Sequence, residues 1–263
     1  MGTYDIHCHI LPAIDDGPER LEDALAMARV AAADGTRVVV ATPHAAQVAA
    51  QGGREALVQR VAAFNDEIQA HHIGLEVAVG SEHFLNLDLV EEIRAGDPVT
   101  LNGSRFILVE VDFLQYPSYT EEALFQIQVQ GKEPVLAHPE RQNTIQKHPD
   151  LLAGLAEHGV VCQITAGSLL GQFGRPAQKS ARGLLKRNLV HLIASDGHSQ
   201  GTYRPPVMSE ATRVIERLMG QETAWLLAEE NPKAIASNGT VRLPEARPSR
   251  RLFTWFGRGR GIR

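Results

Sequence analysis

Residues 5–17 read DIHCHILPAIDDG, and this stretch sets the expectation for the fold and its site. His7 and His9 are two residues apart, so both side chains lie on the same face of an extended strand. Two imidazoles side by side on an apolar strand can bind one metal ion, whereas Cys8 points to the opposite face and is expected in the core. A single histidine or aspartate at a strand end is more often a cap or a satisfied core group. The metal interpretation therefore requires ligands from other strands.

Short apolar runs alternate with longer helical patterns along the rest of the chain. The runs are nearly continuous in apolar residues, as strands buried on both faces are. Strands that alternate with helices predict βαβ units, and seven such units indicate an α/β fold that closes into a regular or distorted barrel. The expected strands are 4–7, 38–42, 75–80, 106–111, 134–137, 160–165 and 191–195. The expected helices are 19–33, 55–72, 87–95, 120–130, 149–158, 176–187, 207–218 and 222–229.

Six of the seven expected strands bring a histidine, aspartate or glutamate to the end where barrels place functional residues. Buried charges are costly unless they are paired or bound to a metal, so this repetition predicts a metal site. Nitrogen and oxygen ligands without cysteine suit Mn²⁺, Zn²⁺ or Fe²⁺. Nine positions exceed what one ion can hold, so two or three ions are expected, with Glu82 as a bridge. The positions are His7, His9, one of Asp15 and Asp16, His44, Glu82, Glu110, His138, Asp196 and His198.

Two arginines accompany these motifs. Arg141 directly follows His-Pro-Glu, and Arg204 lies six residues after His198. Multi-metal sites hold phosphoryl oxygens and activate water near neutral pH, and a guanidinium group beside them would bind a phosphate. The alternative for each arginine is a solvated loop residue.

The composition is that of an ordinary soluble protein. The 263 residues are 43% hydrophobic and 22% charged, with a net charge of −5, which argues against a general nucleic-acid binder. The two cysteines form no CxxC pair, so no disulfide scaffold or zinc ribbon is expected. No apolar run approaches the roughly 20 residues of a membrane span, and the first ten residues do not resemble a signal peptide. A cytoplasmic protein is expected.

The end of the chain differs from the rest in charge. Seven arginines and one glutamate give residues 242–263 a net charge of +6, which leaves −11 for the remainder. We expect one domain over 1–241 and a flexible tail over 242–263. Aromatic residues stand among the arginines of 247–263, a composition that suits an anionic membrane surface. The alternative is a tail that only aids solubility.

The motifs resemble the polymerase-and-histidinol-phosphatase (PHP) superfamily. They resemble more narrowly the manganese-dependent protein-tyrosine phosphatases of bacterial capsule and exopolysaccharide operons. HxH and DxH are common to the superfamily, whereas HPER, QITAGSLLG and ASDxH are more specific to the tyrosine-phosphatase branch. The matching stretches are DIHCHILPAIDDG at 5–17, ATPH at 41–44, GSE at 80–82, ILVE at 107–110, VLAHPER at 135–141, QITAGSLLGQFG at 163–174 and VHLIASDGH at 190–198. The resemblance extends from residue 5 to about 235 and implies a distorted (β/α)7 PHP barrel with its metal site at the carboxyl ends of the strands.

The resemblance also implies a trinuclear site, with Mn²⁺ as the metal and Zn²⁺ or Fe²⁺ as alternatives. The family pattern favours Asp16 over Asp15. Carried over position by position, one ion would be held by His7, His9, Glu82 and Asp196, the second by Glu82, Glu110 and His138, and the third by Asp16, His44 and His198. Arg141 matches the catalytic arginine of the family, and Arg204 matches a second one.

The implied reaction is hydrolysis of phosphotyrosine on a protein by a metal-bound hydroxide, with Arg141 neutralising charge on the phosphoryl oxygens. The implied substrate is an autophosphorylated, membrane-associated tyrosine kinase of polysaccharide biosynthesis, so the enzyme would work at the inner face of the membrane. Oligomers occur in this family, and an oligomer is compatible with the sequence. A cysteine-dependent phosphatase is excluded, because Ile14 and Ser168 stand where its loop needs an arginine after Cys8 and Cys162.

Three other functions stay open on the sequence alone. A phosphatase of a small molecule such as histidinol phosphate would use the same ligands, although QITAGSLLG and HPER argue against it. A non-catalytic, kinase-binding regulatory module would not need a complete ligand set. An amidohydrolase also opens with HxH, but it usually needs a carbamylated lysine or a further histidine pair where this chain has Glu82 and Glu110.

Overall fold

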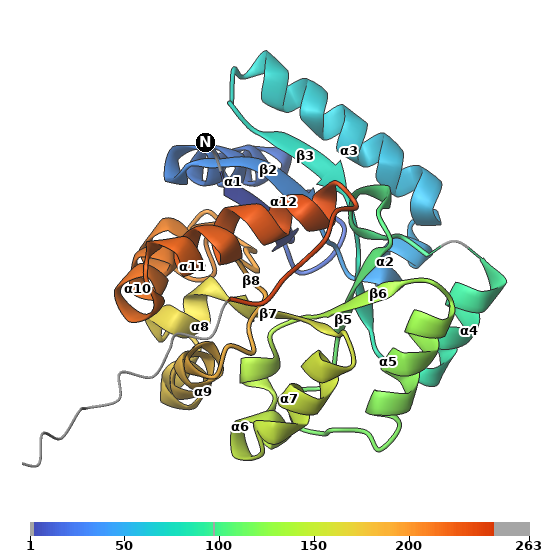
Figure 1. The fold of residues 1–263 in the computed structure, drawn as a ribbon. Coiled ribbons are helices and arrows are strands. Elements are labelled where there is room, and N and C mark those ends of the chain that lie inside the picture. The colour runs from blue at the N-terminus through green and yellow to red at the C-terminus, as the bar shows by residue number, and fades with distance from the viewer. Residues whose placement is uncertain (1–2, 97, 245–263) are drawn as a thin grey trace, which may run out of the picture.

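The structure, a computed structural model, describes residues 3–96 and 98–244. These residues form an α/β fold in which strands that pair in parallel are surrounded by helices (Figure 1). The strands are β1 (Thr3–Cys8), β2 (Thr36–Ala41), β3 (Glu76–Val79), β4 (Glu82–Phe84), β5 (Phe106–Glu110), β6 (Glu133–Leu136), β7 (Val161–Thr165) and β8 (Leu192–Ala194). The alternation of strands and helices that the sequence predicts is confirmed.

Each of the eight expected helical stretches contains a helix. Four further α-helices of five or six residues went unpredicted, because one or two turns are too short to show a helical period. The helices are α1 (Leu21–Asp34), α2 (Ala45–Ala50), α3 (Gly53–Ala70), α4 (Leu87–Ala95), α5 (Thr120–Val129), α6 (Asn143–Lys147), α7 (Asp150–Glu157), α8 (Ala166–Leu170), α9 (Gly174–Lys186), α10 (Ser209–Met219), α11 (Gln221–Trp225) and α12 (Asn231–Ala236). Two short 3₁₀ helices are η1 (Leu101–Gly103) and η2 (Pro139–Arg141), and η3 (Leu226–Glu230) is a π-helix.

The strands form two sheets, with orders β1-β2-β3 and β4-β5-β6-β7-β8. The described residues thus contain eight strands where seven were predicted. The additional strand arises because the expected strand 75–80 ends at Val79 and pairing resumes at Glu82. Val79 of β3 pairs with Ala41 of β2, and Glu82 of β4 pairs with His44, which follows β2. The partners in each pair are 38 residues apart, so β3 and β4 keep the same register along β2 and the residues after it. Three residues that begin with a glutamate and a histidine carry no strand pattern, which is why β4 was missed.

Backbone hydrogen bonds join the two sheets at two seams. At the first, β1 meets the segment after β8: Asp196 N donates to His7 O at 2.8 Å, and His9 N donates to Gly197 O at 2.8 Å. At the second, Glu82 N donates to the carbonyl that precedes His44, at 3.1 Å. Residues from the predicted metal site therefore lie at both seams.

Buried polar side chains reinforce the first seam. The carboxylate of Asp5 accepts hydrogen bonds from Ser195 N at 3.0 Å and from Ser195 Oγ at 2.5 Å. Burial raises the pKa of Asp5 to about 6 against the opposing effect of these hydrogen bonds. Thr42 Oγ1 accepts from Cys8 N at 3.0 Å, and the Cys8 side chain is fully buried, as predicted.

The hydrophobic core consists of three clusters. The largest packs strands of the five-stranded sheet against helices, and the second packs β1–β3 against α1 and α3. The third draws on both sheets, with Ile6, Val40, Leu108 and Leu192 among its members, and Ile235 of α12 joins it. Apolar packing thus fills the space between the sheets and leaves the polar residues at the strand ends.

The chain after α12 lies against the domain as far as it is described. Arg242 donates to Glu230 Oε1 at 2.7 Å, and Asn231 Nδ2 donates to Arg242 O at 2.7 Å. The rest of the predicted tail, 245–263, lies outside the described residues, and so does the whole of the predicted membrane-contacting segment 247–263. Among the described residues, no helix is long and apolar enough to cross a membrane.

Gly80, at the interruption between β3 and β4, offers a test of this architecture. A Cβ atom there would lie 2.6 Å from Val40 Cγ1 and 3.1 Å from Ala41 O. We expect Gly80→Ala to lower the free energy of unfolding by about 1–3 kcal/mol, measured by urea denaturation. The control is Gly183→Ala in α9, where a Cβ meets nothing within 4 Å and should add up to about 1 kcal/mol. Equal stability of the two variants would contradict the close packing at Gly80.

Candidate metal centre

The structure brings all nine predicted ligand positions together, eight of them in or after the carboxyl end of a strand and Glu82 directly after the interruption between β3 and β4. They come from both sheets, so the cluster exists only where the two sheets meet. His7 is in β1, with His9 and Asp16 after it; His44 follows β2; Glu82 begins β4; Glu110 ends β5; His138 follows β6; Asp196 and His198 follow β8.

The Glu82 carboxylate lies at the centre of the cluster and is 2% exposed. Its Oε1 atom is 3.2 Å from His7 Nε2 and 3.1 Å from His138 Nε2. Its Oε2 atom is 3.3 Å from His9 Nε2 and 3.3 Å from His44 Nδ1. Burial would raise the pKa of Glu82, but these imidazoles hold that pKa well below its usual value. One carboxylate therefore faces four histidines from the ends of three strands, as a bridging ligand would.

The two predicted arginines meet at Asp196. Arg141 Nη1 donates to Asp196 Oδ2 at 2.9 Å, and Arg204 Nη2 donates to Asp196 Oδ1 at 2.6 Å. The Arg141 guanidinium also lies between two phenyl rings, 4.3 Å from the centre of Phe113 and 4.2 Å from that of Phe173. Both cations are therefore fixed beside the carboxylate–imidazole cluster.

Three subsets of the described residues bring their ligand atoms within 4.8 Å of one another. The subsets overlap, as expected for ions that share ligands. They are His9, Asp16, His44 and His198; His7, His9 and Glu82; and His44, Glu82 and Glu110. The first contains all three ligands of the implied third ion. The last contains His44 where the resemblance implies His138, although His138 Nε2 also lies 3.8 Å from Glu110 Oε2.

The chain is similar to a known protein family, to named relatives and to a solved structure. The family described as "Capsular polysaccharide synthesis, CpsB/CapC" matches residues 3–237. The chain belongs to the CpsB/CapC family. The tyrosine-protein phosphatase YwqE of Bacillus subtilis (strain 168) is 35% identical over 254 residues, 96% of this chain and 99% of that protein. The tyrosine-protein phosphatase CpsB of Streptococcus agalactiae serotype III (strain NEM316) is 30% identical over 239 residues, 89% of this chain and 98% of that protein.

A solved structure of CpsB/CapC proteins also matches. It is described as "Crystal structures of YwqE from Bacillus subtilis and CpsB from Streptococcus pneumoniae, unique metal-dependent tyrosine phosphatases". It superposes with a TM-score of 0.85 at 34% identity and covers 94% of this chain and 100% of that chain. The resemblance inferred from the motifs is confirmed at the level of the family.

The side chains fit divalent ions in both chemistry and spacing. Two ligands that each lie about 2.1 Å from one ion are separated by roughly 3.0–3.5 Å, which is the spacing around Glu82. His198 Nε2 is buried and has no well-directed hydrogen-bond partner among the described residues, although Asp16 Oδ1 is 3.1 Å away. A ring nitrogen and a carboxylate oxygen that face each other without a good hydrogen bond fit two ligands of one cation.

The shifted pKa values within the cluster also fit a site for divalent ions. Burial would lower the pKa of His7, but Glu82 above all raises it to about 9. Burial would also lower the pKa of His9, but Asp15 and Glu82 raise that pKa to about 10. Burial, and then repulsion from Glu82, raise the pKa of Glu110 to about 7. Protons on His7 and His9 therefore compensate the nearby carboxylates, and a bound ion would take the place of those protons.

The two aspartates of the DDG turn occupy different places. Asp15 Oδ2 lies 2.6 Å from His9 Nδ1 and accepts a hydrogen bond from His44 N at 3.0 Å, so Asp15 orients two histidines. Asp16 is 58% exposed, and its Oδ1 atom lies 3.1 Å from His198 Nε2 and 3.5 Å from His44 Nε2. Asp16 therefore faces the cluster, in line with the choice that the family pattern favours.

Several supporting residues were not assigned a role from the sequence. Gln163 Oε1 lies 3.0 Å from His7 Nδ1 and orients that ring. The buried Glu140 accepts from Ser168 Oγ at 2.6 Å and from Thr165 N at 3.0 Å, which ties the HPER turn to the end of β7. Burial raises the pKa of Glu140 to about 7. Gln163 belongs to the motif QITAGSLLG and Glu140 to HPER. The sequence therefore marked both segments, but it did not show which contacts these two side chains make.

Three residues of the site have a strained backbone. His138, Asp196 and Arg204 have φ values of 34°, 52° and 52°, in the left-handed region that such residues rarely adopt. Each costs of order 1 kcal/mol and persists only where the surroundings enforce it. At these three positions the left-handed backbone turns two ligands and Arg204 toward the cluster.

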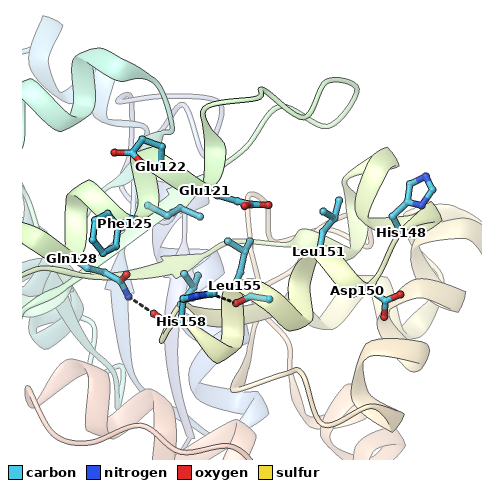
Figure 2. A pocket seen from close by; sticks show the side chains of 12 residues that line it. Glu121, Glu122, Phe125, Gln128, His148, Asp150, Leu151, Leu155 and His158 are labelled. Atoms are coloured by element: carbon cyan, nitrogen blue, oxygen red, sulfur yellow. Dashed lines mark hydrogen bonds between the residues drawn. The ribbon is translucent and has the colours of Figure 1, made fainter.

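A cavity of about 830 Å³ lies apart from the metal cluster, between α5 and α7 (Figure 2). Leu124, Phe125 and Leu155 contribute apolar surface to it, and Gln128 Nε2 donates to His158 O at 2.8 Å on one side. It contains none of the predicted ligands or arginines.

The contrast between Asp15 and Asp16 can be tested by substitution. We expect Asp16→Ala to bind about one Mn²⁺ fewer per chain than the parent, measured by elemental analysis after equilibration and desalting. Asp15→Ala should instead lower the unfolding free energy of the metal-free protein by about 1–3 kcal/mol, because the His44 amide loses its acceptor. Unchanged metal content in Asp16→Ala would exclude Asp16 as a ligand.

Proposed function

We propose that this protein is a metal-dependent protein-tyrosine phosphatase that hydrolyses phosphotyrosine on proteins. The observation that carries the proposal is the pair of arginines fixed on Asp196 at the edge of the carboxylate–imidazole cluster. This arrangement places phosphate-binding cations beside a site suited to divalent ions. Family membership and the tyrosine-phosphatase names of the relatives support the same activity.

We assign three divalent ions to the site, with Mn²⁺ as the native metal and Glu82 as a shared ligand. The ligands are the nine residues of the cluster in the grouping that the family resemblance implies. When bound, such ions activate water and neutralise charge on phosphoryl oxygens. The overlapping subsets in the structure support more than one ion.

The arginines act on the phosphoryl group in this proposal. Arg141 is restrained by Asp196, Phe113 and Phe173, so little further ordering is needed when it binds a phosphoryl oxygen. Arg204 approaches from the loop after β8 and adds a second guanidinium group. Donors held in place before the reaction stabilise the charge that develops in phosphoryl transfer.

We also infer that the two sheets constitute the distorted (β/α)7 PHP barrel. The common register of β3 and β4 along β2 makes them one interrupted strand position out of seven. The hydrogen bonds at both seams connect the remaining positions into a ring. We retain residues 1–241 as the phosphatase domain and 242–263 as its tail.

The proposed substrate is an autophosphorylated, membrane-associated tyrosine kinase of polysaccharide biosynthesis, reached from the cytoplasm at the inner face of the membrane. The capsular-polysaccharide description of the family supports this setting. The positive charge and aromatic residues of 247–263 suit contact with anionic lipid.

The activity is tested by phosphate release from a phosphotyrosine peptide with Mn²⁺, with chelator, with vanadate, and beside histidinol phosphate. We expect Mn²⁺-dependent release from the peptide, loss with chelator, weak inhibition by vanadate and little release from histidinol phosphate. Arg141→Ala should reduce kcat/KM by about 100-fold or more, whereas Arg187→Ala at the surface should not.

Other outcomes of that assay would identify the alternatives. Turnover of histidinol phosphate without turnover of the peptide would indicate a small-molecule phosphatase. A metal-loaded protein that hydrolyses neither compound would indicate a kinase-binding module without catalysis.

Membrane contact by the tail is tested with vesicles. We expect the full chain to sediment with phosphatidylglycerol-containing vesicles, less so as salt is raised, because the attraction is electrostatic. A chain ended before Pro248 should not sediment, and neutral phosphatidylcholine vesicles serve as the control. Equal binding by the full and shortened chains would remove this function from the tail.

A further inference from the structure

A second cavity, of about 380 Å³, opens beside Arg141. The rings of Phe113, Phe173 and Tyr203 line it, together with amide side chains such as that of Gln146. Among the described residues that line it, Arg141 is the only one with a charged side chain. The cavity thus has walls of aromatic rings and amide groups, with one cation and no carboxylate.

The cavity shares two residues with the edge of the metal cluster. Arg141 donates to Asp196 at 2.9 Å and lines the cavity. Phe113 also lines it, and its ring centre lies 5.0 Å from that of His138. A molecule with its anionic end at Arg141 would therefore meet the cluster at one end and the aromatic rings at the other.

We propose that this cavity is an aryl-binding subsite, which holds the phenol ring of phosphotyrosine while its phosphoryl group lies at Arg141. This inference rests on the proposed function and adds the residues that select an aryl over an alkyl phosphate. A planar ring with a dianionic tip can pack against these aromatic rings while its charge lies at the one cation of the lining. Phosphoserine has no ring to fill the cavity and loses those contacts.

Tyr203 forms the outer side of the subsite. Its side chain is 64% exposed, and its ring centre is 6.4 Å from that of Phe173 at an interplanar angle of 67°. A ring that enters beside Phe173 would cover part of that exposed surface. The loop that carries Tyr203 is held through its backbone, because Ser199 Oγ donates to Tyr203 O. The Tyr203 side chain can therefore be changed without removing that bond.

Glycines position Phe173 against Arg141. Gly171 and Gly174 have φ values of 89° and 85°, a conformation that favours glycine, and they bracket the turn that carries Phe173. A Cβ at Gly167 would lie 3.0 Å from the Phe173 ring, so the missing side chain leaves room for it. These glycines belong to the stretch AGSLLGQFG, residues 166–174, which gives that motif a physical role.

The decisive variants are Tyr203→Ala and Tyr203→Phe, with Phe125→Ala as a control for loss of an exposed aromatic residue on α5. Kinetics use two peptides that differ only in phosphotyrosine or phosphoserine. We expect Tyr203→Ala to raise KM for the phosphotyrosine peptide about two- to tenfold, with a smaller effect on kcat. Tyr203→Phe and Phe125→Ala should have the KM and kcat of the parent for the phosphotyrosine peptide. None of the three substitutions should change the kinetics with the phosphoserine peptide.

Binding provides a readout that does not require turnover. In calorimetry with the Mn²⁺-loaded protein, phenylphosphonate should bind more tightly than methylphosphonate. Tyr203→Ala should weaken phenylphosphonate binding by the same two- to tenfold factor and leave methylphosphonate unchanged. An unchanged phenylphosphonate affinity, or equal weakening of both ligands, would overturn the aryl subsite.

The two proposals fail in different ways. If the parent releases no phosphate from phosphotyrosine yet shows a Tyr203-dependent preference for phenylphosphonate, the aryl subsite stands and the phosphatase proposal falls. If the parent hydrolyses phosphotyrosine and neither its KM nor phenylphosphonate binding responds to Tyr203→Ala, the phosphatase proposal stands and the aryl subsite falls.

Discussion

Four imidazoles from the ends of three strands, β1, β2 and β6, converge on the buried carboxylate of Glu82, and both sheets are arranged around that contact. A carboxylate that is 2% exposed is tolerated only with compensating partners, so each of those strands must end at the correct height and angle. The seam hydrogen bonds, the left-handed residues and the orienting Asp15 and Gln163 all serve this requirement. Apolar packing between the sheets supplies stability, while the Glu82 contact determines how the sheets meet.

The cations at the rim are fixed in a different way. Arg141 is restrained by two phenyl rings on its faces and one carboxylate on its edge. A long flexible side chain normally loses conformational entropy when it binds an anion, and here much of that loss has already occurred during folding. The same two rings also line the neighbouring cavity, so the residues that restrain the cation are among those proposed to recognise a ring.

The convergence of polar residues at the strand ends could be predicted from the sequence. A β-strand has a side-chain period of two residues, and parallel strands all end at the same edge of the sheet. The spacing of His7 and His9 and the carboxylates after later strands therefore located the cluster. Loop conformation carries no such period. The sequence alone did not separate Asp15 from Asp16, reveal β4, or show that Phe113 and Phe173 enclose Arg141. Those features depend on turns and on contacts between residues distant in sequence.

The first seam joins the beginning of the chain to its last strand. Asp5 accepts hydrogen bonds from Ser195, 190 residues away, and Asp196 and His198 enter the cluster from the same late segment. A chain still being synthesised on the ribosome can form β1 and β2 early, but it has no complete cluster until this segment has emerged. Partial translation products that end before this segment therefore lack the full site, and the polypeptide acquires the site only once the residues after β8 have emerged.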